Sequence, residues 1–199
     1  APRPSFRRPE YLWRNSQRYG RLRPILLSDA AITIRPMAAA DSVAVLAIYQ
    51  EGIDTGQATF EQTAPTWDRW DTGHSADCRV VAEDADGIAG WAALSPVSAR
   101  SVYAGVAEIS IYVAERARGK RIGDQLMDAT IEASEAAGYW PLQSSLFAEN
   151  TASVRLHERH GFRLMGKRER IARMAFGPMQ GVWRTTVILE RRSDTVGIE

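Results

Sequence analysis

The segment at residues 108–126 constrains the fold of this chain more than any other. It reads as a β-strand that runs into a short, basic, glycine-containing turn, and this turn opens an amphipathic helix. Such a turn directs several unpaired backbone N–H groups and the positive end of the helix dipole at one point, which suits a pyrophosphate. The segment predicts a site for a phosphorylated cofactor, although basic turns also occur on ordinary protein surfaces.

The periodicity of this segment assigns its side chains to faces. One face of the strand is apolar, and the opposite face carries the carboxylate of Glu108. Downstream, apolar residues recur at helical spacing as far as Ala137, and Gly138 is a typical stop signal with a left-handed backbone. The helix is expected to begin near Gly123. The loop before it is then lined by Arg118, Gly119, Lys120, Arg121 and Gly123.

The loop resembles the cofactor signature of the GNAT acetyltransferase superfamily, which is Arg/Gln-x-x-Gly-x-Gly/Ala between a strand and a helix. Residues 118–123 supply this window, with Arg121 in the place of the usual middle glycine. If the position needs a positive φ, arginine costs free energy there, although its guanidinium could also contact a phosphate.

A second segment, residues 150–162, resembles the Asn…Ser…Leu-His-Glu…Gly-Phe segment of the phosphinothricin acetyltransferase group. Its His157 stands where most other GNAT enzymes carry tyrosine. The resemblance covers about residues 32 to 192, and it departs at Thr185, where the group often has aspartate. Further matches to the group are Thr59, Phe60, Glu61, Arg100, Tyr103, Glu108, Gly181 and Trp183.

Composition agrees with one enzyme domain, because 199 residues with 45% hydrophobic and 25% charged content can enclose one substantial core. The net charge is only +1. The chain has no apolar run of membrane-spanning length and no secretory signal at its start, so we expect a cytoplasmic protein without membrane contact. Cys78 is the single cysteine, so we expect no disulfide, no metal site and a structural thiol.

Charge is concentrated at the start of the chain, where seven arginines precede residue 28 and only Glu10 opposes them. Aromatic residues interleave with these arginines, as in some nucleic-acid contacts. We favour an extension that packs on its own domain or on a partner subunit, so nucleic-acid binding is the less favoured interpretation. The expected organisation is a basic extension at residues 1–30, an acetyltransferase-like domain at 31–192 and a tail at 193–199.

The expected fold class is α/β, with a mixed and mostly antiparallel central sheet flanked by helices. The resemblance implies that the central strand and the strand at 142–146 splay apart, so that the pantetheine arm of the cofactor inserts between them. A β-bulge is the usual device for such splaying. Strands are expected at 31–36, 79–83, 88–94, 108–113, 142–146, 162–171 and 182–191, and helices from 41, at 67–70, from 123 and at 152–160.

The resemblance also implies the chemistry of the site. Glu108 is the candidate general base and His157 the candidate group near the thiol, although these two roles can be exchanged. A backbone N–H near Tyr112 or Val113 would polarise the thioester carbonyl. Asn150 can bind pantetheine amides or simply cap its helix. The full set of predicted cofactor contacts is Ile111, Tyr112, Val113, Arg118, Gly119, Lys120, Arg121, Ile122, Gly123, Asn150 and Ser153.

The implied activity is N-acetylation, with acetyl-CoA as acyl donor, of a small amino-acid-like amine such as phosphinothricin, methionine sulfoximine or methionine sulfone. Transfer would be direct, in a ternary complex. Substrate contacts are expected from Phe60, Glu61, Arg100, Tyr103 and Trp183. Acetylation of peptide or protein amines and a noncatalytic CoA-binding regulatory module are the alternatives, and family habit suggests a homodimer.

Overall fold

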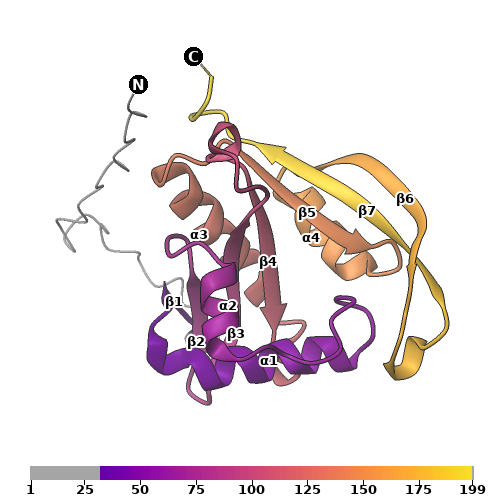
Figure 1. The fold of residues 1–199 in the computed structure, drawn as a ribbon. Coiled ribbons are helices and arrows are strands. Elements are labelled where there is room, and N and C mark those ends of the chain that lie inside the picture. Colours follow the sequence, from indigo (N-terminus) through magenta and orange to yellow (C-terminus); the bar gives the residue numbers. More distant parts are fainter. Residues whose placement is uncertain (1–31, 199) are drawn as a thin grey trace, which may run out of the picture. The chain divides into compact units, whose positions relative to one another are not determined.

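Seven strands form one sheet in the order β1-β2-β3-β4-β5-β7-β6 (Figure 1). Neighbouring strands run antiparallel except β4 and β5, which are parallel. The predicted mixed, mostly antiparallel sheet is therefore confirmed. The strands are β1 (Thr33–Pro36), β2 (Val80–Asp84), β3 (Gly87–Pro96), β4 (Ala107–Val113), β5 (Pro141–Phe147), β6 (Arg163–Arg173) and β7 (Trp183–Arg192).

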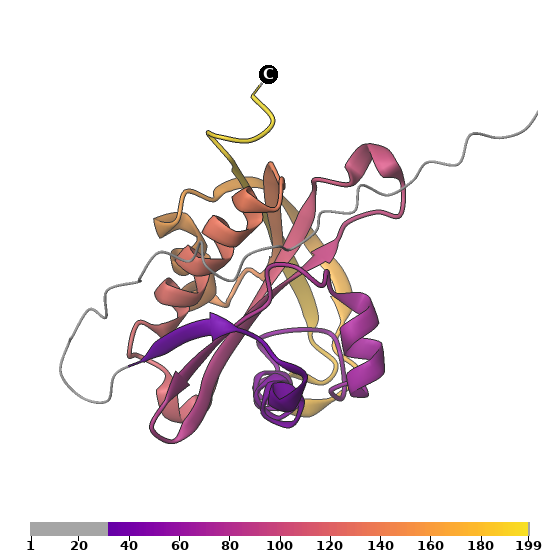
Figure 2. The same cartoon turned by 90° about the vertical axis from the view of Figure 1, so that its left-hand side faces the viewer.

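Four α-helices cover the sheet. Figures 1 and 2 show that α1 and α2 lie on one face and that α3 and α4 lie on the other. Gly138 follows α3 with φ +86°, as its predicted role in ending the helix requires. The helices are α1 (Ser42–Asp54), α2 (Trp67–Gly73), α3 (Ile122–Ala136) and α4 (Thr151–Arg159).

The fold is seen in a computed structural model, which describes residues 32–198. The predicted basic extension at residues 1–30 lies outside the described residues. The hypothesis of nucleic-acid binding concerns this extension, so it also falls outside them. In the described part of the chain, no helix is both long enough and apolar enough to cross a membrane. Across the same residues, no group of three or more His, Cys, Asp and Glu side chains is arranged to hold a metal ion.

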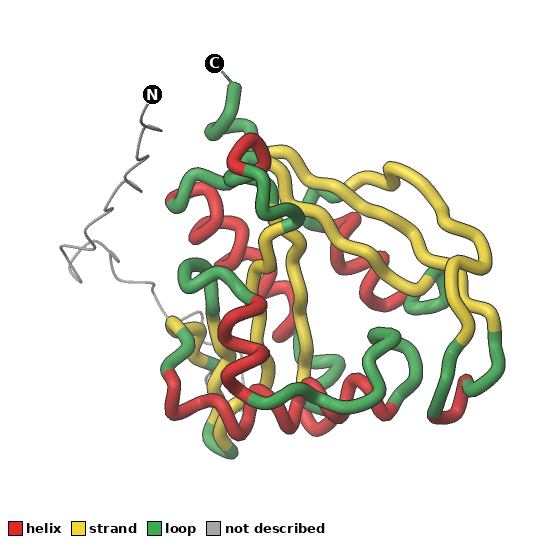
Figure 3. Tube along the Cα trace, viewed as in Figure 1, coloured by secondary structure: helices red, strands yellow, loops and turns green. Residues whose placement is uncertain are grey.

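Strands β4 and β5 separate soon after they meet. They pair only at Ala107 with Leu142 and at Glu108 with Gln143. Beyond these pairs β4 stays with β3, and β5 stays with β7 along its whole length. The two halves of the sheet diverge as a result (Figure 3). The expected splaying of the central strands is therefore confirmed.

The expected bulge is wrong, because the register between β3 and β4 is unbroken over all of the described β4. Instead, β4 stays paired with β3 and β5 stays paired with β7, and this separates the two halves of the sheet. The Ala114 N–H donates to the Ala89 carbonyl at 2.9 Å. Backbone groups alternate in direction along an antiparallel strand, so those of Tyr112 face β3, and those of Ile111 and Val113 face the open side.

Packing on both faces holds β4 in place. On the α3 and α4 face, Ala107 and Ile109 are buried in a cluster with Leu142. On the α1 face, the ring of Tyr112 stacks on Trp91 with 4.8 Å between centroids. The Trp91 indole N–H also donates to a backbone carbonyl of α1. The strand that borders the gap is therefore anchored by burial, although it lacks a partner strand there.

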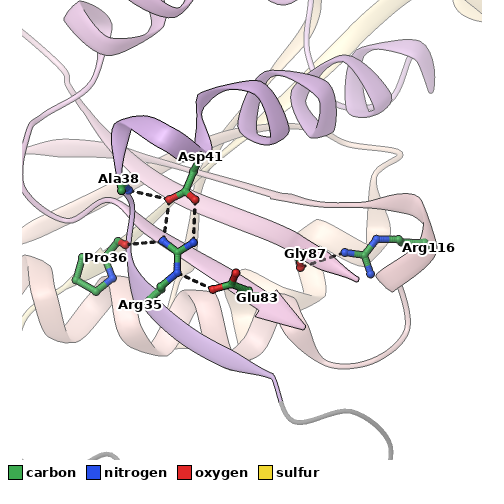
Figure 4. Close-up of polar contacts among 7 residues, drawn as sticks. All are labelled: Arg35, Pro36, Ala38, Asp41, Glu83, Gly87 and Arg116. Carbon is green, nitrogen blue, oxygen red and sulfur yellow. Dashed lines mark hydrogen bonds and ion pairs between the residues drawn. The ribbon is translucent and has the colours of Figure 1, made fainter. Parts of the chain in front are cut away.

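Polar contacts join the start of α1 to the sheet (Figure 4). The Arg35 guanidinium donates two hydrogen bonds of 2.8 Å to Asp41 and one of 2.7 Å to Glu83. Asp41 was expected to cap α1, but its side chain makes no bond to that helix. A 3₁₀ turn precedes α1, so the carboxylate accepts from the Ala38 N–H at its start instead. These hydrogen bonds to Arg35 hold the pKa of Asp41 below its usual value.

Candidate active site

A cavity of about 820 Å³ opens where β4 and β5 diverge. Segments from α1, its following loop, β4, β5, the 118–123 turn and α4 form its walls. The structure brings together here every predicted catalytic and cofactor-binding residue except Lys120, which is exposed outside the lining. The lining residues among those predictions are Glu108, Ile111, Tyr112, Val113, Arg118, Gly119, Arg121, Ile122, Gly123, Asn150, Ser153 and His157.

The turn at residues 118–123, called the basic turn below, has a left-handed backbone at two positions. Gly119 has φ +79° and Arg121 has φ +59°. Helix α3 begins within this turn at Ile122, one residue before the predicted start, and its N-cap residue Arg121 offers no side-chain hydrogen bond. The first N–H groups of this helix are therefore left for another acceptor. An anion bound at the basic turn would supply that acceptor.

Arg121→Gly is expected to stabilise the fold by up to about 1 kcal/mol, because glycine adopts a positive φ without the cost that a side chain adds. The Arg121 side chain is 81% exposed, and its one ion-pair partner within residues 32–198 is Asp124, at 3.8 Å. We therefore expect acetyl-CoA affinity to be kept or increased, as titration calorimetry would report. Arg121→Ala is the control, because it removes the guanidinium but keeps the strained backbone. Weaker binding in both variants would show instead that the guanidinium holds phosphate.

Glu108 lies on the α1 face of β4, at the last pair before the strands part. Its side chain is half-buried, and this burial raises the pKa of its carboxyl above the ordinary value. A hydrogen bond from the Ser145 backbone N–H and the positive charge of Arg168 act on the pKa in the opposite direction. A carboxylate with a raised pKa in a cavity has the properties of a general base.

His157 is buried in α4, with only 2% of its surface exposed. Its Nδ1 lies 2.8 Å from the Ser153 carbonyl oxygen, so Nδ1 carries the proton and Nε2 keeps its lone pair. Burial lowers the pKa of the ring and favours this neutral form. Nε2 is buried without a hydrogen-bond partner among the described residues. Because His157 lines the cavity, this lone pair is available to a hydrogen of a molecule bound there.

Asn150 uses both ends of its side chain within the protein. Its carbonyl oxygen accepts from the Ser153 N–H at 3.2 Å and caps α4, and its amide donates to the Gln57 carbonyl at 3.1 Å. The capping role that the sequence offered for Asn150 is therefore present. The bond to Gln57 also ties the loop after α1 to the start of α4 across the cavity.

Two of the predicted substrate residues lie beside the cavity. The Phe60 ring packs edge-on against Phe147 with 4.8 Å between centroids. Burial raises the pKa of Tyr49 and of Tyr112, and the negative charge of Glu61 raises both further. Thr59, directly before Phe60 and Glu61, lines the cavity, so the loop that carries these two residues forms part of its rim.

The other three predicted substrate residues are not part of the cavity lining. Arg100 lies over the Tyr103 ring at 5.7 Å, ahead of β4 and at the end where β4 and β5 stay paired. Tyr103 lines a separate hollow of about 320 Å³ together with Trp140. Trp183 begins β7, is 49% exposed and lies under the Arg170 guanidinium.

Several cavity residues were missed by sequence reasoning. Ser145 comes from β5, and Tyr49 and Thr59 come from α1 and its loop, so their approach depends on the tertiary fold. Arg155 and Arg159 of α4 also line the cavity and add positive charge near the basic turn. Their spacing of four residues places them on one face of a helix, which is the signal that could have identified them.

Comparison with known proteins agrees with this geometry. The acetyltransferase (GNAT) family profile matches residues 45–162. The L-methionine sulfoximine/L-methionine sulfone acetyltransferase of Pseudomonas paraeruginosa is 30% identical over 168 residues, covering 81% of this chain and 95% of the relative. The phosphinothricin N-acetyltransferase of Streptomyces viridochromogenes is 32% identical over 139 residues, covering 68% of this chain and 76% of the relative.

A solved structure shares both fold and sequence with this chain. It is the GNAT superfamily phosphinothricin acetyltransferase from Sinorhizobium meliloti in complex with AcCoA, with a TM-score of 0.72 and 30% identity. The match covers 84% of this chain and 91% of that one. The splayed sheet, the basic turn at the start of α3 and these matches lead to one conclusion. The chain belongs to the acetyltransferase (GNAT) family and is an N-acetyltransferase.

Proposed function

We propose that this enzyme transfers the acetyl group of acetyl-CoA to the amine of a small amino-acid-like substrate, by direct attack in a ternary complex. Substrates of this class are phosphinothricin, methionine sulfoximine and methionine sulfone. The observation that carries the proposal is one cavity in which a half-buried carboxylate, Glu108, and a neutral histidine, His157, share walls with the basic turn. The substrates named for the relatives support the substrate class.

The residues present fit this acyl donor. The basic turn and the first N–H groups of α3 suit its diphosphate. The backbone groups of Ile111 and Val113 face the gap and lack a partner strand, so they suit the amides of a pantetheine arm. The unpaired Nε2 of His157 offers a further contact in the same cavity. When bound, acetyl-CoA supplies an acetyl group activated as a thioester.

The direction of the β4 backbone selects the donor that polarises the carbonyl. The Tyr112 N–H faces β3, so it is not available to a molecule in the gap. The Val113 N–H faces the open side and lines the cavity. Of the two residues predicted for this role, only Val113 has its N–H on the open side, so we assign the role of oxyanion donor to it. Its hydrogen bond strengthens as negative charge develops on the carbonyl oxygen.

Two protons leave the substrate nitrogen when an ammonium ion becomes an amide. Glu108 takes the first, directly or through a water, and its raised pKa makes it a stronger base than an exposed carboxylate. His157 takes the second on Nε2 and gives it to the departing thiolate. The ring enters and leaves the cycle neutral, as its buried position requires. His157 therefore accepts a proton from the substrate amine before it donates a proton to the thiolate.

We also propose, from the family resemblance, that the enzyme acts as a cytoplasmic homodimer. The outer strand β6 and its neighbour β7 expose apolar side chains that a second copy can cover. They are Leu164, Met165, Ile171 and Trp183, each between 49% and 61% exposed.

A screen that measures release of free CoA tests the proposed function. The panel holds phosphinothricin and methionine sulfone, unmodified glutamate and methionine, and a short peptide with a free amino terminus. We expect the first two to exceed the unmodified amino acids by at least about tenfold in kcat/KM, since a pocket built for a polar group discriminates strongly against its absence. Release with the peptide alone would support the protein-amine alternative, and binding without any release would support the regulatory module.

A further inference from the structure

Arg168 of β6 lies across the open face of β7 and β5, with two neutral oxygens as partners. Its Nη2 donates to the Ser145 hydroxyl at 2.6 Å, and its Nε donates to the Thr186 hydroxyl at 3.2 Å. Ser145 belongs to β5 and Thr186 to β7, so the guanidinium spans the strand between its own and the cavity wall. These two bonds fix the orientation of the group.

The strand is irregular directly after this residue. Arg168 pairs with Thr186 in regular register, and the register with β7 then shifts before Ala172. Arg170, inside the shifted segment, has φ +49°. Bulges of this kind re-aim side chains and occur often beside active sites. The register shift therefore gives Arg168 a different orientation from the charged side chains that follow it in β6, which point outward.

Ser145 joins Arg168 to the cavity. Its hydroxyl accepts from Arg168 at 2.6 Å, and Ser145 itself lines the cavity. Glu108 lines the same cavity and pairs with Gln143, which lies two residues before Ser145 and so on the same face of β5. A small molecule bound there lies between Arg168 and Glu108.

Among the described residues, the charge of Arg168 has no close counter-ion. Other arginines of the sheet have carboxylates near them, such as Arg35 with Asp41 at 2.8 Å and Arg191 with Glu135 at 2.9 Å. The ion pairs found within residues 32–198 do not include Arg168. A guanidinium has five N–H donors, and the hydroxyls occupy only some of them. The remaining donors form a fork that suits a carboxylate.

We propose that Arg168 binds the α-carboxylate of the substrate while Glu108 receives its amine, so that the enzyme requires an α-amino acid. This inference rests on the proposed function. It assigns the carboxylate clamp to Arg168 in place of Arg100, because Arg168 bonds Ser145 of the cavity lining, whereas Arg100 lies over Tyr103. An α-amino acid carries its two charged groups on one carbon, which matches a cation beside Ser145 and a base, Glu108, in the same cavity.

The experiment compares methionine sulfone with its decarboxylated amine, methylsulfonylpropylamine, in CoA-release assays of the wild type, Arg168→Gln and Arg168→Lys. For wild type we expect kcat/KM to be roughly 50-fold higher for the amino acid, the value of a paired charged hydrogen bond. Arg168→Gln should lose that factor for methionine sulfone, mainly through KM, and change less than about twofold for the decarboxylated amine. Arg168→Lys keeps the charge without the fork and should recover part of the loss.

Lys167→Gln is the matched control, since it removes a neighbouring charge whose ion-pair partner in the described part of the chain is the exposed Glu169. We expect wild-type kinetics from it on both substrates. Equal use of the two substrates by the wild type would overturn the role of Arg168 and leave the proposed function standing. An equal loss on both substrates in Arg168→Gln would also overturn it, because a merely structural residue would act in that way. Failure of the wild type to acetylate either amine would refute the proposed function itself.

Discussion

Glu108→Gln is expected to lower kcat by roughly 10²- to 10⁴-fold, which is the usual contribution of a positioned general base. The amide keeps the size of the side chain and can still contact the Ser145 N–H, but it cannot take a proton. Acetyl-CoA affinity should change by less than about twofold, because the basic turn and the open edge of β4 are untouched. Steady-state CoA release gives the first quantity and titration calorimetry the second.

The pH profile gives an independent check on Glu108. Burial raises the pKa of this carboxyl, so kcat should fall as the pH drops through a value above the ordinary 4.5. The fall should disappear in Glu108→Gln. Glu132→Gln serves as the control, since Glu132 is exposed on α3 away from the cavity lining and its loss should leave the profile intact. Wild-type turnover in Glu108→Gln would remove Glu108 from the mechanism.

Arg184→Ala is expected to destabilise the fold by about 3–5 kcal/mol, the range for removal of one member of a buried polar cluster. Arg184 is fully buried on β7. Its guanidinium donates to the Gly56 carbonyl at 2.6 Å and to the Gln57 side chain at 2.7 Å, and it stacks on Phe147 at 3.9 Å. The variant would leave these buried oxygens unpaired beside a cavity. Urea unfolding measures the change in the free energy of unfolding.

Two variants separate the parts of this effect. Arg184→Met keeps most of the packing against Phe147 and loses the hydrogen bonds, so we expect an intermediate loss of stability. Arg163→Ala removes a side chain that is 67% exposed, and its effect should stay within about 0.5 kcal/mol. A loss below about 1 kcal/mol in Arg184→Ala would mean that the loop after α1 holds its position without this residue.

Local periodicity was enough to predict most of the elements. The alternation along residues 107–113 and the helical spacing after Ile122 placed β4, the basic turn and α3 within two residues of their observed bounds. Short-range signals also identified the end of α3 at Gly138. Each of these features is set by residues close in sequence, whose conformational preferences act before tertiary packing. The local alternation along β4 also determines which of its residues face the gap.

Residues distant in sequence could not be placed in this way. Arg184 binds Gly56 across 128 positions, and Arg168 meets Ser145 across 23. Which arginine is buried, and which lies near Glu108, depends on the order of β5, β7 and β6 in the sheet. Motif matching alone therefore favoured Arg100, which precedes β4 by only a few residues. Its approach to Tyr103 became visible only in the folded chain.

Asp41 shows how a local rule can fail when two local structures compete. A carboxylate before an apolar helix usually caps that helix. Here the 3₁₀ turn at 39–41 gives Asp41 a helical backbone, with φ −80° and ψ −8°, so its side chain turns back to Ala38 and Arg35. The helix begins at Ser42, one residue after its expected start, and the carboxylate stabilises the connection to β1 and β2.

A crystal structure of the protein with a non-hydrolysable acetyl-CoA analogue would show where the cofactor binds. We expect the diphosphate to lie against the backbone N–H groups of the basic turn at residues 118–123. We expect the pantetheine arm to run between β4 and β5, with hydrogen bonds to Ile111 and Val113. A diphosphate bound elsewhere, or an arm that lies outside the gap, would refute the proposed cofactor site.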